Sequence, residues 1–223
     1  VFFLFLSAFI KAVDTYPELI RESVASPEND LRMGAMEAPP AIMSIFLGSK
    51  LLEQLKNFST NGTLTSQKGE EIQLGVRTIS PLSRDLTDRN RTSPIAFTGN
   101  RFEFRTPGSG LTISRPVFSL NVAVADVLCE MADMLEDATD RDKAVRVILN
   151  DTLAKNARIL YNGDNYSEEW IKEAEKRGLT NLPDTIDSLL AIENEKTVGL
   201  FEKQKVLSRE EYSARMDSAY AQY

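Results

Sequence analysis

The sequence has 223 residues, of which 42% are hydrophobic and 26% are charged, and these fractions are typical of a soluble globular protein. Its net charge of −7 argues against a general nucleic-acid binder or a membrane-surface binder. The single cysteine, Cys129, excludes an internal disulfide, and the absence of histidine excludes Ser–His and Cys–His nucleophile pairs and ordinary zinc sites.

Chemistry in this chain is therefore restricted to carboxylates, arginine, lysine, hydroxyl and backbone groups. A bound metal should be a hard, oxygen-ligated ion such as Mg²⁺. Cys129 lies in the apolar run VAVADVLCEM, and we expect a small core residue there rather than a nucleophile. One unpaired cysteine fits a reducing compartment, so we expect a cytoplasmic protein.

The chain opens with VFFLFLSAFIKAVDTYPELI, and its first ten residues have the apolar character of a signal peptide. They lack a basic segment and a small-residue cleavage site, and the run is too short to span a bilayer. The amphipathic pattern continues through Lys11 and Val13, so we expect a buried helix over 2–14 with further sequence upstream. Five N-x-[ST] sequons slightly favour a secreted protein instead, at Asn57, Asn61, Asn90, Asn150 and Asn165.

The segment up to residue 115 combines helices, loops and strands. A second short helix should follow, capped by Asp14 or Thr15 with Pro17 in its first turn. The pattern then predicts a loop over 24–38, a further helix over 40–56 and a polar loop over 57–70. A half-buried strand over 71–79 and an irregular stretch over 79–92 should follow. SPIAF and RFEFR should pair as a hairpin through Thr98-Gly99-Asn100, and a loop over 106–115 ends the segment.

From Pro116 onward the pattern is helical. Two long helices are expected over 116–137 and 140–160. A third should begin after a Ser167 cap and end before Gly178, and a fourth should begin at Pro183-Asp184. The last helix should begin at a capping box in SREE at 208–211. The fold class is therefore α+β. We expect two regions, a mixed region over 1–115 and a helical C-terminal region over 116–223.

The strand RFEFR raises a question about charge. Arg101, Glu103 and Arg105 share one face of the strand, while Phe102 and Phe104 share the other and should face a core. Residues 77–105 hold six arginines, three acidic residues and no lysine, which gives a local charge of +3. One interpretation is a surface ladder of ion pairs. The other is an anion site, in which Glu103 holds a metal and guanidinium forks hold phosphate or carboxylate.

A second cluster is NDLRMGAMEAPPA, in which Glu37 lies between flexible Gly34 and rigid Pro39-Pro40. A carboxylate on such a loop can close over a site and act as a base. The alternative is that Glu37 starts a helix, with its charge near the positive end of the helix dipole.

These two clusters, NDLRMGAMEAPPAIMSIFLG and TDRNRTSPIAFTGNRFEFR, resemble glutamine synthetase of the large type III branch, and YNGDNYSEEWIKEAEKRGLTNL and LFEKQKV resemble its C-terminal region. The opening helix also resembles that family, which argues against a signal peptide. The resemblance covers nearly all of the chain. It implies ligation of ammonia to glutamate through a γ-glutamyl phosphate, with ATP as cosubstrate and Mg²⁺ or Mn²⁺ as cofactor.

The resemblance also assigns roles to residues. Glu103 resembles the metal-ligand glutamate of the R-x-E-x-R strand, Arg105 the arginine beside substrate and phosphoryl group, and Arg101 the arginine on the nucleotide side. Arg91 resembles the ATP-contacting arginine of the N-R-[ST] motif. Arg32 resembles the arginine that holds the substrate carboxylate, and Glu37 the flap glutamate that takes a proton from ammonium.

The sequence departs from the family's common bacterial type I pattern at Ala96, where those enzymes carry a second arginine. The remaining carboxylates, the metal-strand histidine and most of the nucleotide pocket of the family lie upstream. We therefore expect a portion of an enzyme that forms homo-oligomeric rings, inactive by itself. A non-catalytic helical interaction or regulatory module is the alternative. RNA binding ranks below both, because RFEFR does not match the RRM signature.

Overall fold

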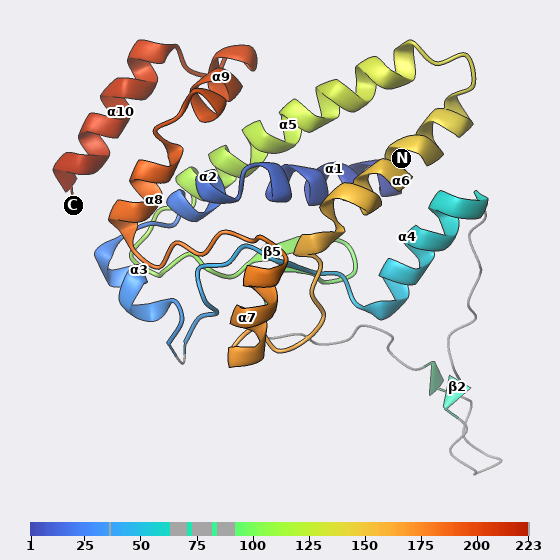
Figure 1. Cartoon of the computed structure of the whole chain (residues 1–223), viewed down its shortest axis with the longest axis horizontal. Helices are drawn as coiled ribbons and strands as arrows, with labels where there is room; N and C mark the ends of the chain where they lie inside the picture. Colours follow the sequence, from blue (N-terminus) through green and yellow to red (C-terminus); the bar gives the residue numbers. More distant parts are fainter. Residues whose placement is uncertain (36, 63–70, 73–81, 84–91, 223) are drawn as a thin grey trace.

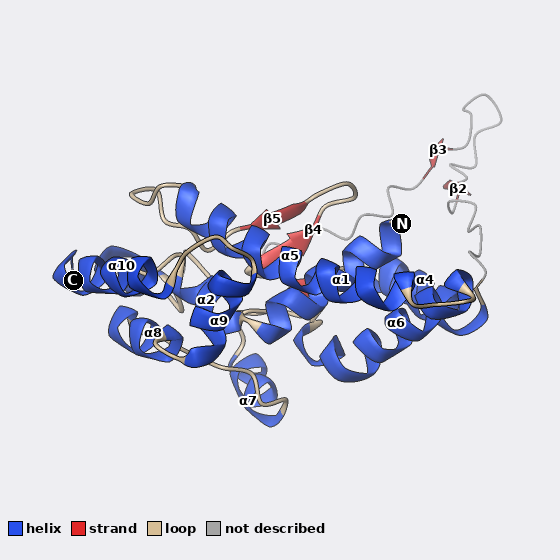
Figure 2. Ribbon diagram, turned by 90° about the horizontal axis from the view of Figure 1, so that it is seen from above, coloured by secondary structure: helices blue, strands red, loops and turns tan. Residues whose placement is uncertain are grey.

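The computed structural model describes residues 1–35, 37–62, 71–72, 82–83 and 92–222. Helices dominate, with one short mixed sheet (Figures 1 and 2). The helices are α1 Phe2–Thr15, α2 Pro17–Glu22, α3 Pro27–Arg32, α4 Ser49–Asn61, α5 Ser114–Glu136, α6 Arg141–Asn156, η1 Ala157–Ile159, α7 Glu168–Lys176, α8 Thr185–Ile192, α9 Glu195–Lys203 and α10 Arg209–Gln222. Within these described ranges, no helix is long and apolar enough to cross a membrane.

The strands are β1 Ile45–Phe46, β2 Glu71–Ile72, β3 Leu82–Ser83, β4 Ile95–Phe97 and β5 Phe102–Phe104. β1, β4 and β5 form the mixed sheet, in which β1 runs parallel to β4 and β4 runs antiparallel to β5. β2 and β3 pair antiparallel. Helices and a small mixed sheet together confirm the α+β class. The strand expected over 71–79 is represented by β2, and its remainder lies outside the described residues.

Helix α1 lies at the centre because both of its sides are apolar. It packs against α5 and α6. One side contributes Ala12 to a core built with α5, α8, α9 and α10, and the other contributes Ile10 to a core built with the sheet, α4 and α6. Figure 1 shows α10 at one end of the molecule and α4 at the other, with α1 and α5 between them. The buried N-terminal helix predicted over 2–14 is confirmed.

Both cores draw side chains from either side of residue 115. Tyr16 shows the connection, because its hydroxyl donates to Asp126 Oδ2 of α5 at 2.8 Å. Asp126 also accepts from Gln204 Nε2 at 2.9 Å and pairs with Lys203. The two regions therefore pack as neighbours through a shared interior, and the division into 1–115 and 116–223 stays a prediction about chain organisation.

The predicted hairpin is confirmed. Thr98 N donates to Arg101 O at 2.9 Å, and Gly99 takes a φ of +98° in the turn, where a residue without Cβ is favoured. Phe102 stacks on Phe9 of α1 with ring centroids 3.8 Å apart. Phe102 and Phe104 both pack against the core around the sheet, as expected for the apolar face of RFEFR.

The helix expected over 40–56 is wrong in its first half. Residues 41–47 are all buried, and Ile45–Phe46 pair with β4 instead of winding into a helix. The helix begins at Ser49, after Gly48 at φ +78°, and runs to Asn61. A continuous apolar run is compatible with a buried strand or a buried helix, so its periodicity did not distinguish the two.

Two further predictions around α2 and α3 are corrected. Residues 24–38 are not all loop, because Ser26 Oγ accepts from Asn29 N at 3.1 Å and starts α3 with Pro27 in its first turn. Helix α2 is preceded by Tyr16, without a side-chain cap, rather than by a capping Asp14 or Thr15. The position of Pro17 at the start of α2 is confirmed.

The C-terminal helices follow their sequence signals closely. Ser167 Oγ accepts from Trp170 N at 3.1 Å, Gly178 takes a φ of +67° after α7, and Ser208 and Glu211 bond reciprocally as a capping box. Cys129 is a correction, because it is exposed on α5, with Sγ 3.9 Å from Gln204 Oε1. Its neighbours in the run supply the buried face of α5, and Cys129 lies off that face.

Candidate active site

Arg32 is the last residue of α3, and its guanidinium is held by the protein itself. Nη1 donates to Asn29 Oδ1 at 2.8 Å and to Thr106 O at 2.9 Å. Nη2 donates to Arg105 O and Pro107 O, both at 3.3 Å. Four of the five guanidinium N–H donors thus face backbone carbonyls and an amide, which leaves Nε for any ligand. In this arrangement Arg32 joins α3 to the segment after β5.

Asn29 is the second element of this connection. It is 2% exposed, and its Nδ2 donates to Val24 O at 2.7 Å and to Thr106 O at 3.1 Å. A Cβ added at Gly108 would lie 3.1 Å from Asn29 Oδ1, so the segment after β5 approaches α3 closely. Sequence reasoning missed Asn29 because its partner Thr106 lies 77 residues further along the chain.

Glu37 lies in a tight turn and is exposed. Gly34, at φ +78°, donates its backbone N–H to Ala38 O and Pro39 O, both at 3.1 Å, which fixes the two ends of the turn. The alternative in which Glu37 starts a helix is wrong, because the chain from 38 to 48 is not helical. Glu37 lies between these two ends with its side chain exposed.

A surface pocket of about 840 Å³ brings Arg32 and Glu37 together. Its lining comes from α3, the turn of Glu37 and the segment after β5, and consists of Ser26, Glu28, Asn29, Leu31, Arg32, Ala35, Glu37 and residues 107–111. Burial raises the pKa of the Tyr166 hydroxyl, and the positive charge of the Arg32 guanidinium opposes that rise. The two residues singled out from NDLRMGAMEAPPA thus share one cavity.

The charged face of β5 forms a ladder. Glu103 Oε2 accepts from Arg105 Nη2 at 3.2 Å and from Arg105 Nε at 3.4 Å, and Glu103 Oε1 lies 3.8 Å from Arg101 Nε. The three side chains are outside the lining of the Arg32–Glu37 pocket. The backbone connects the two places, because Arg32 binds the carbonyl of Arg105. The ion-pair ladder is present, and the strand that carries it is fastened to the pocket wall.

The described residues do not by themselves make up a metal site. Among them, no group of three or more carboxylate or cysteine side chains is arranged to hold an ion. Glu103 offers carboxylate oxygens of the kind that Mg²⁺ and Mn²⁺ prefer, and further ligands would have to come from elsewhere. Arg91, the remaining site residue expected from the sequence, lies outside the described residues.

Comparison with known proteins matches residues 144–223 to the glutamine synthetase C-terminal domain family. The whole chain is 42% identical over 225 residues to a type-3 glutamine synthetase of Dictyostelium discoideum, of which the match covers 31%. The chain belongs to the glutamine synthetase family. Glutamine synthetases of Bacteroides fragilis and Butyrivibrio fibrisolvens are 36% and 35% identical across the whole chain, which matches 32% of each.

The chain thus spans about a third of the length of these glutamine synthetases. The clusters containing Arg32, Glu37 and Glu103 fall within the matched part. The resemblance inferred from those clusters is therefore confirmed at the level of the family.

Replacing Arg32 with lysine tests its connection to the segment after β5. Arg32→Lys keeps the charge but replaces a planar fork by one ammonium, so most of the four hydrogen bonds are lost. We expect backbone amides of residues 106–111 to exchange with deuterium about tenfold faster. Arg101→Lys, at an exposed position, is the control and should leave exchange in 106–111 unchanged. Equal exchange in both variants would contradict the connection.

Proposed function

We propose that the longer protein carrying this chain is an ATP-dependent glutamate–ammonia ligase. ATP phosphorylates the side-chain carboxylate of glutamate, which gives γ-glutamyl phosphate and ADP. Ammonia then attacks the acyl carbon, phosphate leaves, and glutamine forms. The proposal is supported by the family membership and by one observation above all. Arg32, which lines the same pocket as Glu37, donates to the carbonyl of Arg105, the residue that directly follows β5 and its Glu103.

Within this proposal each residue has a role. Glu37, exposed on its turn, takes the proton that ammonium loses. Arg105 stabilises negative charge near the transferred phosphoryl group, and Arg101, whose side chain is 72% exposed, contacts nucleotide. Arg32 contributes to substrate-carboxylate binding through Nε and through the wall that it holds in place. We keep ATP contact as the proposed role of Arg91.

Divalent metal is the proposed cofactor, Mg²⁺ or Mn²⁺, with Glu103 as one ligand. When bound, such an ion neutralises part of the negative charge of the phosphate groups. Among the described residues, no three carboxylate or cysteine side chains are placed to hold an ion together. The upstream portion of the enzyme is the proposed source of further ligands, homo-oligomeric rings are the proposed assembly, and the cytoplasm is the proposed compartment. We expect the 223-residue chain alone to be inactive.

The test measures glutamine and phosphate in the longest natural chain that carries this sequence, supplied with glutamate, ammonium, ATP and Mg²⁺. Equal amounts of glutamine and phosphate are expected. Glu103→Gln should raise the Mg²⁺ concentration for half-maximal activity at least about tenfold, because a carboxylate ligand becomes a neutral amide. Absence of glutamine formation would favour a non-catalytic regulatory module, and an unchanged Mg²⁺ requirement would remove Glu103 from the metal site.

A further inference from the structure

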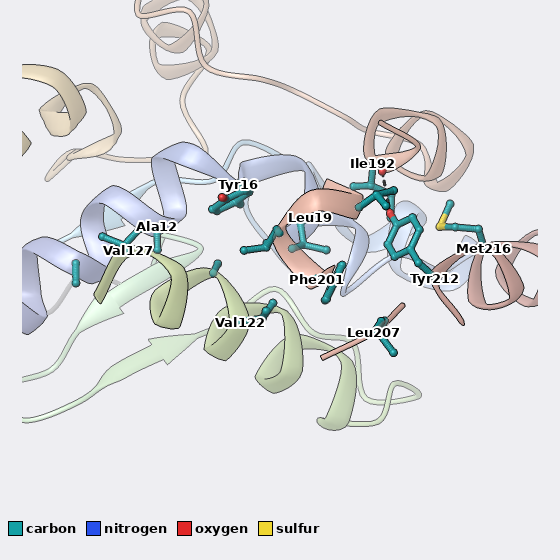
Figure 3. Packing of buried hydrophobic residues seen from close by; sticks show 14 of the residues in the cluster. Ala12, Tyr16, Leu19, Val122, Val127, Ile192, Phe201, Leu207, Tyr212 and Met216 are labelled. Carbon is teal, nitrogen blue, oxygen red and sulfur yellow. Dashed lines mark hydrogen bonds between the residues drawn. The ribbon is translucent and has the colours of Figure 1, made fainter. Parts of the chain in front are cut away.

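A second pocket shares no lining residue with the Arg32–Glu37 pocket. It has a volume of about 380 Å³, within the range of roughly 300–1,000 Å³ that is usual for small-molecule sites. Its walls come from α2, α5, α8, α9 and α10. Figure 3 shows part of this region, with Tyr212 reaching from α10 toward Ile192.

The floor of this pocket is apolar and rigidly held. Its apolar lining consists of Leu19, Phe118, Ile192, Phe201, Leu207, Met216 and Ala219. Phe118 and Phe201 stack with ring centroids 5.4 Å apart, and the Tyr212 hydroxyl donates to Ile192 O at 2.8 Å. The polar end of Tyr212 is thereby satisfied within the protein, so its ring serves as apolar wall.

Two arginines line the same pocket from different helices. Arg115 of α5 pairs with buried Glu22 through Nη2, which also donates to Glu22 O at 3.2 Å. Arg215 of α10 is exposed and lies over the Phe118 ring at 6.0 Å from its centroid. In the described part of the chain, no carboxylate lies within ion-pair distance of Arg215. The charged lining residues, Glu22, Arg115 and Arg215, therefore leave one net positive charge in a protein of net charge −7.

Charge and apolarity together define the ligand class. An apolar body can bury itself against the floor, but a molecule without a hydrogen-bond acceptor would desolvate the guanidinium groups without replacing their hydrogen bonds. A carboxylate at one end of the molecule would accept charge-assisted hydrogen bonds from Arg215 and from the remaining donors of Arg115. Burial raises the pKa of Glu22 while Arg115 lowers it, which agrees with one acidic group enclosed behind this arginine.

We propose that this pocket binds a single-chain amphiphilic carboxylate, with the alkyl chain against the floor and the carboxylate between Arg115 and Arg215. The site is separate from the residues assigned to the ligase reaction. Its ligand is recognised by chemistry alone: an unbranched apolar chain and one negative charge. Binding at this pocket therefore goes beyond the proposed function and does not depend on glutamine formation.

Titration calorimetry on the longest natural chain that carries this sequence tests the proposal. Dodecanoate, used below its micelle concentration, should bind saturably with one molecule per chain, and decanoate should bind roughly fourfold more weakly for each methylene removed. Arg215→Gln should weaken dodecanoate binding about tenfold. Arg209→Gln, on the same helix but paired with Glu195 outside the pocket, should leave it unchanged.

Two further binding measurements use an uncharged ligand, dodecanol, and a variant whose pocket is filled by a larger side chain. Dodecanol has the same chain without the charge and should bind at least about tenfold more weakly than dodecanoate. Ala219→Phe places a ring inside the pocket and should abolish binding of dodecanoate while the far-ultraviolet circular dichroism stays unchanged. Absence of saturable binding, equal affinity for dodecanol, or full affinity in Arg215→Gln would each overturn the proposal.

Discussion

Glu37→Ala, made in the longest natural chain that carries this sequence, should lower the rate of glutamine formation by about 10²–10⁴-fold and leave the affinity for ATP within about twofold. The carboxylate is exposed on a turn whose ends are joined by hydrogen bonds from the Gly34 N–H. It lines the same pocket as Arg32, and among the described residues its side chain makes no hydrogen bond or ion pair. Its loss therefore removes a proton acceptor without removing a structural support. Glutamine formation and equilibrium ATP binding are the two measurements.

Two further variants distinguish the loss of the base from the loss of side-chain volume and from the loss of a negative charge in the pocket. Glu37→Gln keeps the size of the side chain and should lose as much activity as Glu37→Ala. Glu28→Ala removes another exposed carboxylate from the lining of the same pocket and should retain most activity. Equal losses of glutamine formation and of ATP affinity in Glu37→Ala would count against a base on a closing flap and would indicate a general disturbance of the site.

Features encoded by neighbouring residues were predictable from the sequence. The capping box at Ser208, the turn at Gly99 and the two faces of RFEFR depend on side chains within a few positions of one another, and all three are confirmed. The two clusters around Glu37 and Glu103 stand out in the same way, because each carries a pattern of residue types at short spacing, and the roles of their residues stay predictions.

Features decided by distant partners were not predictable. Residues 41–47 are buried and not helical because Ile45–Phe46 pair with β4 fifty residues later, and nothing local separates that outcome from a helix. Arg32 illustrates the same limit at the site. The sequence could show an arginine near a flexible loop, but not that most of its donors would bind the carbonyls of residues 105–107. Pairing of such groups follows from the fold and not from spacing.

Asp30→Ala should lower the free energy of unfolding by about 3–5 kcal/mol, because it leaves a buried cation without its counter-ion. Arg21, on α2, has a side chain that is 1% exposed. Its Nη2 donates to Asp30 Oδ1 at 2.8 Å and to Pro183 O at 2.9 Å, and its Nε donates to Leu182 O at 2.7 Å. Asp30 Oδ2 accepts from Thr185 N at 2.7 Å and so caps α8 from another helix. Thermal or urea unfolding measures the loss.

The mechanism of this loss can be separated from the loss of the cap. Asp187→Ala removes an exposed carboxylate from the first turn of α8 and should cost less than about 1 kcal/mol. Arg21→Met combined with Asp30→Ala removes cation and anion together, so it should be more stable than Asp30→Ala alone although one more side chain is changed. If the double variant is instead the less stable of the two, the hydrogen bonds to Leu182 and Pro183 outweigh the unpaired charge. The ion pair would then act chiefly as an anchor that holds the start of α8 against α2 and α3.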